Sequence, residues 1–181
     1  PSTLTFTSSN LKNDQTVTVN GVIYNLDDDS VTSTVTVAIN TGNTADTDYD
    51  ILSSQSISVT TSDSDTASFT IVQTSNSTSV AESGSSTDTF TVVLGSQPTD
   101  DVAFRVTAGD ISEATVSPDT LSFTSSNWNT AQTVTVTGVN DNVSDDNVTS
   151  TMTVAINQGS TADTKYNALS SLSLIHISEP T

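Results

Sequence analysis

The sequence predicts an all-β chain made of antiparallel β-sandwiches in tandem, the first of them incomplete. Valine and threonine alternate in runs such as residues 16–19 and 133–136, and period-two alternation of β-branched residues is typical of half-buried strands. The chain also matches itself at an offset of 117 residues, close to the length of one sandwich. No segment has a convincing helical period.

The internal repeat defines the modules. Residues 1–56 match residues 118–173 without a gap, and 37 of the first 57 positions are identical. A fixed internal period of this kind indicates a repeat array. Taking the phase that begins after Asp65, we expect the C-terminal part of a first module over residues 1–65 and a nearly complete second module over residues 66–174.

Short strands separated by turn-forming residues are expected in both modules. In the second module they fall near 67–73, 87–94, 101–107, 120–124, 132–139, 148–156 and 171–174. The first module holds only later strands, near 3–7, 15–23, 31–39 and 55–61. A sandwich without its opening strands exposes a sheet edge and half of its core. We therefore expect an upstream segment to complete this module.

The last residues depart from the repeat. Residues 175–181 should echo residues 58–64, but they read Ile-His-Ile-Ser-Glu-Pro-Thr instead. Residues 174–181 resemble a translated sequencing adapter, and we interpret 175–181 as a non-repeat tail of artefactual origin. The only histidine, His176, lies in this tail, so we assign it no catalytic or metal-binding role.

The composition disfavours several partners. The formal net charge is −18, and the basic residues are only Lys12, Arg105 and Lys165. Nucleic-acid backbones and anionic membrane surfaces bind clustered positive charge, so neither is an expected partner. No apolar run approaches the roughly 18 residues of a membrane span, so no membrane insertion is expected. The chain has no cysteine, which excludes disulfides and thiolate metal sites.

Two acidic loops at equivalent positions predict cation binding. Residues 139–147 contain Asp141, Asp145 and Asp146, and the counterpart at 22–30 contains Asp27, Asp28 and Asp29. Two carboxylates 4 Å apart repel by roughly 1 kcal/mol in water and about 4 kcal/mol at an effective dielectric of 20. Calcium suits such a loop because the available ligands are oxygens on flexible segments. An Asx-rich turn without an ion is the alternative.

A third acidic stretch lies where one module joins the next. Residues 61–66 contain Asp63 and Asp65 in an Asp-x-Asp pattern that offers further oxygen ligands. An ion bound there would also fix the angle between modules. A solvated turn is the alternative.

Together these features resemble the Calx-β family, whose members place an acidic residue after the first strand, an acidic loop between later strands and an acidic linker at the end of the module. The matching features here are residues 79–84 with Glu82, the strand at 87–94 and the loop at 139–147. The resemblance covers residues 66–174 and, in part, 1–65. Tyr24 stands where the second module has Asp141, and the loop is rich in Asp and Asn rather than Glu.

The resemblance implies an immunoglobulin-like sandwich that binds calcium at one end, as in exchanger regulatory domains and in bacterial surface and adhesin-like proteins. The candidate calcium ligands of the first module are Asp27, Asp28, Asp29, Asp63 and Asp65. Those of the second module are Glu82, Asp110, Asp141, Asp145 and Asp146. Asp110 is included on an assumed loop position.

We therefore expect a non-catalytic structural or adhesive repeat of a large extracellular or cell-surface protein, stiffened by Ca²⁺. Its expected partners are neighbouring repeats of the same chain, cell-surface glycans or further copies of itself. An enzyme is not expected, because a serine nucleophile needs a base and the only histidine lies in the tail. The alternatives are a carbohydrate- or ice-binding module, a calcium-independent spacer and a regulatory calcium sensor.

Several aromatic residues are expected to have packing roles. Phe104, Phe123 and Trp128 are predicted to lie in or at the edge of the core. Tyr49 and its repeat counterpart Tyr166 are predicted to pin a long loop to the sandwich.

Overall fold

A computed structural model describes residues 2–82, 85–140, 146–169 and 173–178. The chain forms two units. Unit 1 comprises Pro1–Tyr24 and Val31–Thr61, and unit 2 comprises Asn25–Ser30 and Ser62–Thr181. The residues 25–30, which the repeat assigns to the first module, thus fold as part of unit 2.

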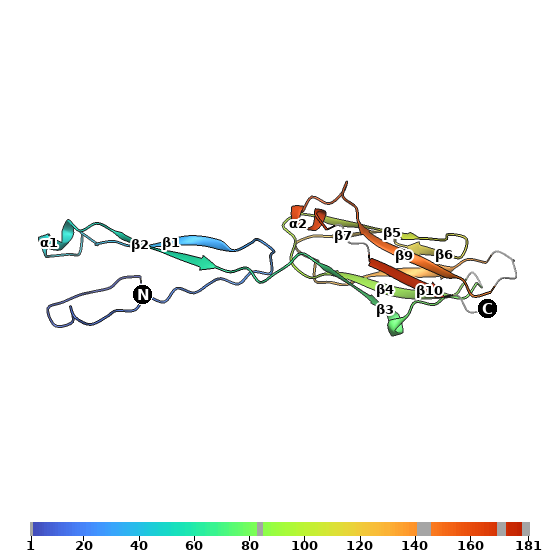
Figure 1. Ribbon diagram of the computed structural model, residues 1–181, viewed down its shortest axis with the longest axis horizontal. Helices are drawn as coiled ribbons and strands as arrows, with labels where there is room; N and C mark the ends of the chain where they lie inside the picture. Colours follow the sequence, from blue (N-terminus) through green and yellow to red (C-terminus); the bar gives the residue numbers. More distant parts are fainter. Residues whose placement is uncertain (1, 83–84, 141–145, 170–172, 179–181) are drawn as a thin grey trace. The chain divides into compact units, whose positions relative to one another are not determined.

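Unit 2 is an immunoglobulin-like β-sandwich of two antiparallel sheets, which confirms the predicted fold class (Figure 1). One sheet has the strand order β3 (Phe69–Gln73), β4 (Thr87–Leu94), β8 (Gln132–Gly138) and β6 (Ala114–Ser117). The other has the order β10 (Ser173–Ser178), β9 (Thr149–Ile156), β5 (Val102–Ala108) and β7 (Thr120–Phe123). The tandem arrangement of two sandwiches stays a prediction.

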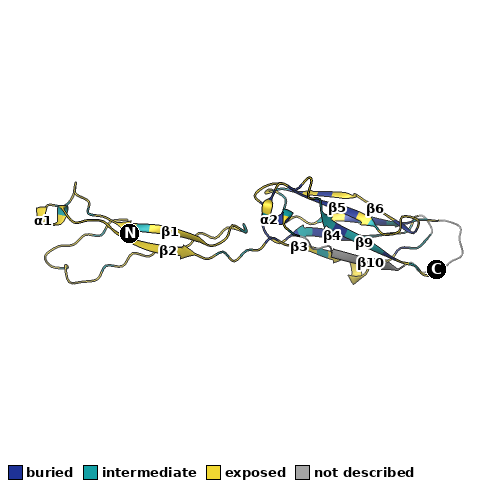
Figure 2. Cartoon of the chain, turned by 45° about the horizontal axis from the view of Figure 1, so that its top comes forward, coloured by how far each residue is buried: buried dark blue, intermediate teal, exposed yellow. Residues whose placement is uncertain are grey.

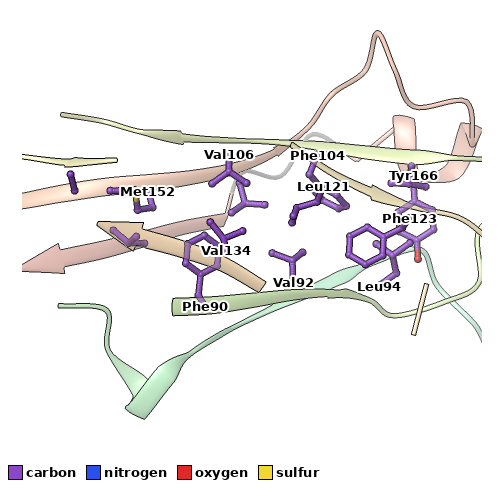
Figure 3. Close-up of a cluster of buried hydrophobic side chains, with 14 of the residues drawn as sticks. Phe90, Val92, Leu94, Phe104, Val106, Leu121, Phe123, Val134, Met152 and Tyr166 are labelled. Atoms are coloured by element: carbon purple, nitrogen blue, oxygen red, sulfur yellow. The ribbon is translucent and has the colours of Figure 1, made fainter. Parts of the chain in front are cut away.

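The core lies between these sheets and follows from the alternation seen in the sequence. Val134 and Val136 of β8 are fully buried, and Thr135 between them is only partly buried. Burial of each such apolar side chain contributes about 1.5–3 kcal/mol. Phe104 packs edge-on against both Phe69 and Phe123, with ring centroids 4.8 and 5.8 Å apart. Figure 3 shows Phe104, Phe123 and Val134 among the side chains that meet between the sheets.

The predicted aromatic core is confirmed in unit 2. Phe104 and Phe123 are fully buried, and Trp128 is partly buried against the same cluster. Tyr166 is also buried, and its hydroxyl donates to the Ser96 carbonyl (2.7 Å) and accepts from the Ser96 N–H (3.1 Å). Tyr166 therefore pins the connection between β9 and β10, as predicted.

One strand and the short helices were not predicted from the sequence. β6 pairs with β8, whereas β7, which begins only three residues after β6 ends, pairs with β5 in the opposite sheet. Each of these strands has only four residues, so the alternation of apolar and polar residues is too short to distinguish two strands in the sequence. The α-helices α1 (Thr47–Asp50) and α2 (Thr164–Asn167) are single turns, and η1 (Thr74–Asn76) is a 3-10 turn. Among the described residues, no helix is long and apolar enough to cross a membrane.

Unit 1 forms only two strands, β1 (Val31–Val37) and β2 (Gln55–Thr61), which pair with each other. The prediction of strands at 3–7 and 15–23 is wrong, because neither segment pairs with another strand in a sheet. Their counterparts in unit 2 are β7, which pairs with β5, and β8, which pairs with β4 and β6. Unit 1 has no counterpart of β4, β5 or β6, which are the strands that pair with β7 and β8 in unit 2.

Burial differs accordingly between residues that are equivalent by sequence (Figure 2). Phe6 is 56% exposed, and its counterpart Phe123 is 0% exposed. Tyr49 is 53% exposed, against 1% for Tyr166. The predicted pinning role of Tyr49 is therefore wrong, because unit 1 supplies no residue equivalent to Ser96.

β10, which contains residues 175–178 of the tail, pairs with β9 in a shifted register. Val37 of β1 lies opposite Gln55, whereas its counterpart Val154 lies opposite Ser173, which is the counterpart of Ser56. A slip of one residue exchanges the two faces of a strand. Ile175 and Ile177 stand where the repeat has Ser58 and Thr60, so the apolar alternation of the tail is itself displaced by one residue.

The paired tyrosines give the first prediction. Tyr166→Phe should lower the free energy of unfolding of unit 2 by about 1–3 kcal/mol, because it leaves buried polar groups of Ser96 without a partner. Tyr49→Phe is the matched control and should leave it unchanged. Urea unfolding followed by the fluorescence of Trp128, the single tryptophan, reports on unit 2. Equal effects of the two substitutions would contradict the role given to Tyr166.

Candidate metal centre

Four of the acidic residues predicted for the first calcium site belong to unit 2 and lie near one another: Asp27, Asp29, Asp63 and Asp65. Together with Lys165 they form what we call the linker cluster. Residues 25–30 reach unit 2 through backbone contacts. Leu26 forms a parallel bridge with Gln97, and the Gln97 N–H donates to the Asn25 carbonyl at 2.6 Å. These contacts place the acidic loop beside the segment that joins β4 to β5.

Carboxylates of the cluster accept hydrogen bonds from backbone amides. Asp63 Oδ2 accepts from the N–H groups of Asp28 (3.0 Å) and Asp29 (3.1 Å), and its Oδ1 accepts from Asp65 N–H (2.9 Å). Asp27 Oδ2 accepts from Ala67 N–H at 2.8 Å. The bond from Asp65, followed by those from Asp28 and Asp29, outweighs partial burial and lowers the pKa of Asp63. Asp63 is thus an ionised acceptor that joins residues 28–29 to the start of β3.

Lys165 brings a positive charge into the cluster. Its Nζ lies 2.8 Å from Asp29 Oδ1 and 3.3 Å from Asp27 Oδ1. The hydrogen bond to Asp29, with a smaller contribution from Asp27, raises the pKa of Lys165. The ammonium therefore balances two of the carboxylates that were predicted to bind calcium.

Most of the carboxylate oxygens of the linker cluster already have partners within the protein. Both oxygens of Asp27, both oxygens of Asp63 and Oδ1 of Asp29 already have protein donors. Asp28 is exposed and contributes its N–H, while Asp65 is partly buried and also contributes its N–H. Within the described part of the chain, no group of three or more His, Cys, Asp or Glu residues is arranged to hold a metal ion. A calcium role for these residues stays a prediction.

The segments that carry the second predicted set converge at one end of the sandwich. Gly138 lies against the Ala81 carbonyl so closely that a Cβ would not fit, and its N–H donates to the Ser86 carbonyl. Val139 N–H donates to the Glu113 carbonyl at 2.8 Å. Gly109 N–H donates to the Thr151 carbonyl at 2.8 Å. The chain around Glu82, Asp110 and Asp146 is therefore gathered at this end.

The side chains of the second set are only partly described. Glu82 is half-buried in the turn before β4, and Asp146 is exposed before β9. Asp110 is exposed, and its Oδ1 accepts from the hydroxyl (2.5 Å) and the N–H (3.0 Å) of Ser112, which lower the pKa of Asp110. Asp141 and Asp145 lie outside the described residues. Their role as calcium ligands stays a prediction.

Sequence reasoning missed Asp163, whose side chain accepts three hydrogen bonds in unit 2. Its side chain is buried and accepts from the N–H (2.7 Å) and hydroxyl (2.9 Å) of Thr99 and from the N–H of Tyr166 (2.9 Å). Burial alone would raise the pKa of Asp163, but these hydrogen bonds lower it. Asp163 is the N-cap of α2, and an Asp three residues before the tyrosine was the signal available in the sequence.

Comparisons with known proteins show similarity at the level of the fold only. No family model matches the chain, and no curated protein matches it. The periplasmic chaperone SfaE is similar with a TM-score of 0.43 and 10% identity over 62% of this chain and 56% of that one. Domains 4 and 5 of the S-layer protein SbsC give a TM-score of 0.40 and 21% identity over 70% of this chain and 59% of that one.

A third similar structure is SSP-19, an MSP-domain-like protein of Caenorhabditis elegans, with a TM-score of 0.40 and 12% identity. It matches over 61% of this chain and 99% of that one. The chain therefore spans little more than half of the chaperone and S-layer chains that it matches. Similarities of this size carry no information about the site.

The ion pairs of Lys165 give the second prediction. Lys165→Met should speed amide hydrogen exchange at Ala67 and Asp29, because the Asp27 and Asp29 carboxylates lose their shared cation and the loop at 25–30 loosens. Lys12→Met is the matched control and should leave both amides unchanged. Exchange measured by NMR decides the outcome, and unchanged exchange in the Lys165 variant would show that the ammonium does not hold the loop.

The third prediction concerns pH. Because the pKa of Asp163 is lowered on folding, its stabilising contribution is present above the ordinary value of 3.8 and is lost as the pH falls below it. Asp163→Ala should cost unit 2 about 1–2 kcal/mol at pH 7. The difference from the parent chain should shrink below pH 3.8.

Asp46 caps α1 in the same way and accepts from Asp48 N–H at 3.0 Å, but it lies in unit 1. Asp46→Ala is therefore the control and should not alter unfolding monitored at Trp128. A penalty for Asp163→Ala that is constant between pH 7 and pH 3 would argue against an ionised Asp163.

Proposed function

We propose that the chain is a non-catalytic structural repeat of a large extracellular or cell-surface protein. The observation that supports this most is the linker cluster. Residues 25–30, which belong to one repeat by sequence, are built into the sandwich formed by the next repeat. Shared residues of this kind suit a chain of repeats in which each contacts its neighbours.

The chemistry of the buried polar groups supports the same proposal. Asp163, Ser96 and Thr161 each bond to backbone or hydroxyl groups that fix loops on the sandwich. Thr161 Oγ1, for example, accepts from Ala103 N–H (3.0 Å) and donates to the Ala103 carbonyl (3.1 Å). These are the contacts of a scaffold rather than groups held ready for proton transfer.

We include Ca²⁺ in the proposal at the end of unit 2 that carries Glu82, Asp110 and Asp146. Asp141 and Asp145, the other predicted ligands, lie outside the described residues. The convergence of these segments and the acidic composition of the loop support it. The ion would offset repulsion among the carboxylates and join the loop before β9 to the turn before β4. The linker cluster needs no such ion, because Lys165 already supplies a cation there.

The fourth prediction tests the calcium component. Extracellular calcium modules bind with dissociation constants of about 10⁻⁴–10⁻³ M, so millimolar Ca²⁺ should stabilise unit 2 by about 1 kcal/mol. Thermal unfolding followed at Trp128 should show a higher Tm with calcium than with a chelator. The double variant Asp145→Ala, Asp146→Ala should abolish the difference.

Asp100 is exposed, lies in unit 2 and is not among the candidate ligands, so Asp100→Ala serves as the control and should keep the calcium response. Identical melting of the parent chain with calcium and with chelator would overturn the calcium component. The chain would then be a calcium-independent spacer, fixed by its linker cluster alone.

A further inference from the structure

We propose that the side-chain amides of Asn127 and Gln132 close the free edge of β7 against strand addition by a second copy of the chain. Among the described strands, β7 pairs with β5 alone and lies at the end of its sheet. Edge strands offer unpaired backbone groups to other chains, and native proteins protect them with particular side chains. This device belongs to the sandwich of unit 2 and is separate from the structural role and the calcium site proposed above.

The register of β7 identifies the backbone groups at its free edge. Just before β7, the Asp119 carbonyl accepts from Val106 N–H of β5 at 2.8 Å, in the same register as the strands themselves. In an antiparallel pair, residues that exchange hydrogen bonds alternate with residues whose backbone groups point away. Counting from Asp119, Ser122 and Thr124 therefore turn their backbone groups away from β5, toward the free edge.

Asn127 holds the hydrogen-bonding groups that an added strand would need. Its Nδ2 donates to the Ser122 carbonyl at 3.3 Å, and its Oδ1 accepts from Thr124 N–H at 2.6 Å. Gln132 Nε2 donates to the same Ser122 carbonyl at 2.6 Å. Because a carbonyl oxygen has two lone pairs, the two amides together saturate this acceptor.

Residues 120–124 themselves carry none of the side chains that commonly protect an edge strand. They read Thr-Leu-Ser-Phe-Thr, without a charge or a proline. An uncharged segment rich in β-branched and aromatic residues favours strand pairing between chains. Two β7 edges are also self-complementary, because antiparallel pairing about a twofold axis brings the same segment to both sides. A second copy is therefore the strand donor against which this edge needs protection.

The same contacts recur in unit 1. Asn10 Nδ2 and Gln15 Nε2 both donate to the Thr5 carbonyl, at 3.1 and 2.8 Å. Asn10 Oδ1 accepts from Thr7 N–H at 2.6 Å. Residues 3–7 form no strand there. The two amides thus reach these positions through the local geometry of the chain, without a sheet beside them.

The two amides are also the same where the sequence between them changes. Residues 11–14 and their counterparts 128–131 differ at every position, whereas the asparagine and glutamine that flank them are identical in both copies. Four consecutive differences between two unchanged amides indicate that the amides are what both copies require.

Removal of both amides from the full chain tests the proposal. Asn127→Ala combined with Gln132→Ala should free the Ser122 carbonyl and Thr124 N–H, so that two copies pair at β7. Sedimentation velocity in about 0.5 M salt, which screens repulsion between copies of net charge −18, should show a concentration-dependent shift toward a dimer. The matched control, Asn10→Ala with Gln15→Ala, removes the same contacts where no strand forms and should sediment as the parent chain does.

Hydrogen exchange at the Thr124 amide locates the association. In the double variant this amide should exchange faster than in the parent when dilute, and roughly tenfold or more slower once the dimer forms. Slow exchange at the amides of Val134 and Val136 verifies that the sandwich is folded. If the double variant loses that slow exchange, Asn127→Ala alone, which keeps Gln132, is measured in the same way.

Two results would overturn the proposal. One is faster exchange at Thr124 with sedimentation equal to that of the parent chain, since the amides would then stabilise only the turn between β7 and β8. The other is a dimer of the variant in which the Thr124 amide stays unprotected, since the copies would then meet at a different surface.

Discussion

The contact between the two sheets of unit 2 is the interaction on which the rest of the structure depends. Each sheet is a valine- and threonine-rich surface whose apolar side needs a facing partner, since half-buried strands gain most of their stability from that contact. The two sheets draw strands from the whole length of the repeat, so neither forms until distant segments meet. Buried aromatic rings, the change of sheet after β6 and the pinning of α2 all follow from this requirement.

The linker cluster depends on a second requirement, which is the compensation of carboxylate charge. A chain with a net charge of −18 has to place carboxylates close together, and each one needs a compensating group. Backbone amides supply most of that compensation around Asp63, and Lys165 supplies the remainder around Asp27 and Asp29. The result is a cluster in which short-range hydrogen bonds and two ion pairs hold the carboxylates.

The sequence was sufficient for elements whose partners lie in the same unit. β4 and β2 have the predicted bounds, and the buried positions of β8 follow the predicted alternation. It failed for residues 3–7 and 15–23, because alternation states what a segment can form and not whether a neighbour is present. Similarly, the acidic loops were evident as clusters of carboxylates, but the approach of Lys165 depends on a contact across 136 residues that no local pattern reveals.

The residue at position 165 is also one of the places where the two copies of the repeat differ in charge. The residue at the equivalent position in the other repeat is Asp48, so the two copies carry opposite charges there. An acidic loop that meets lysine is attracted, whereas the same loop meeting aspartate is repelled. Near-identical neighbours in an array are prone to exchange strands with one another during folding. A repeat that carries aspartate at this position cannot form the two ion pairs that Lys165 makes with Asp27 and Asp29.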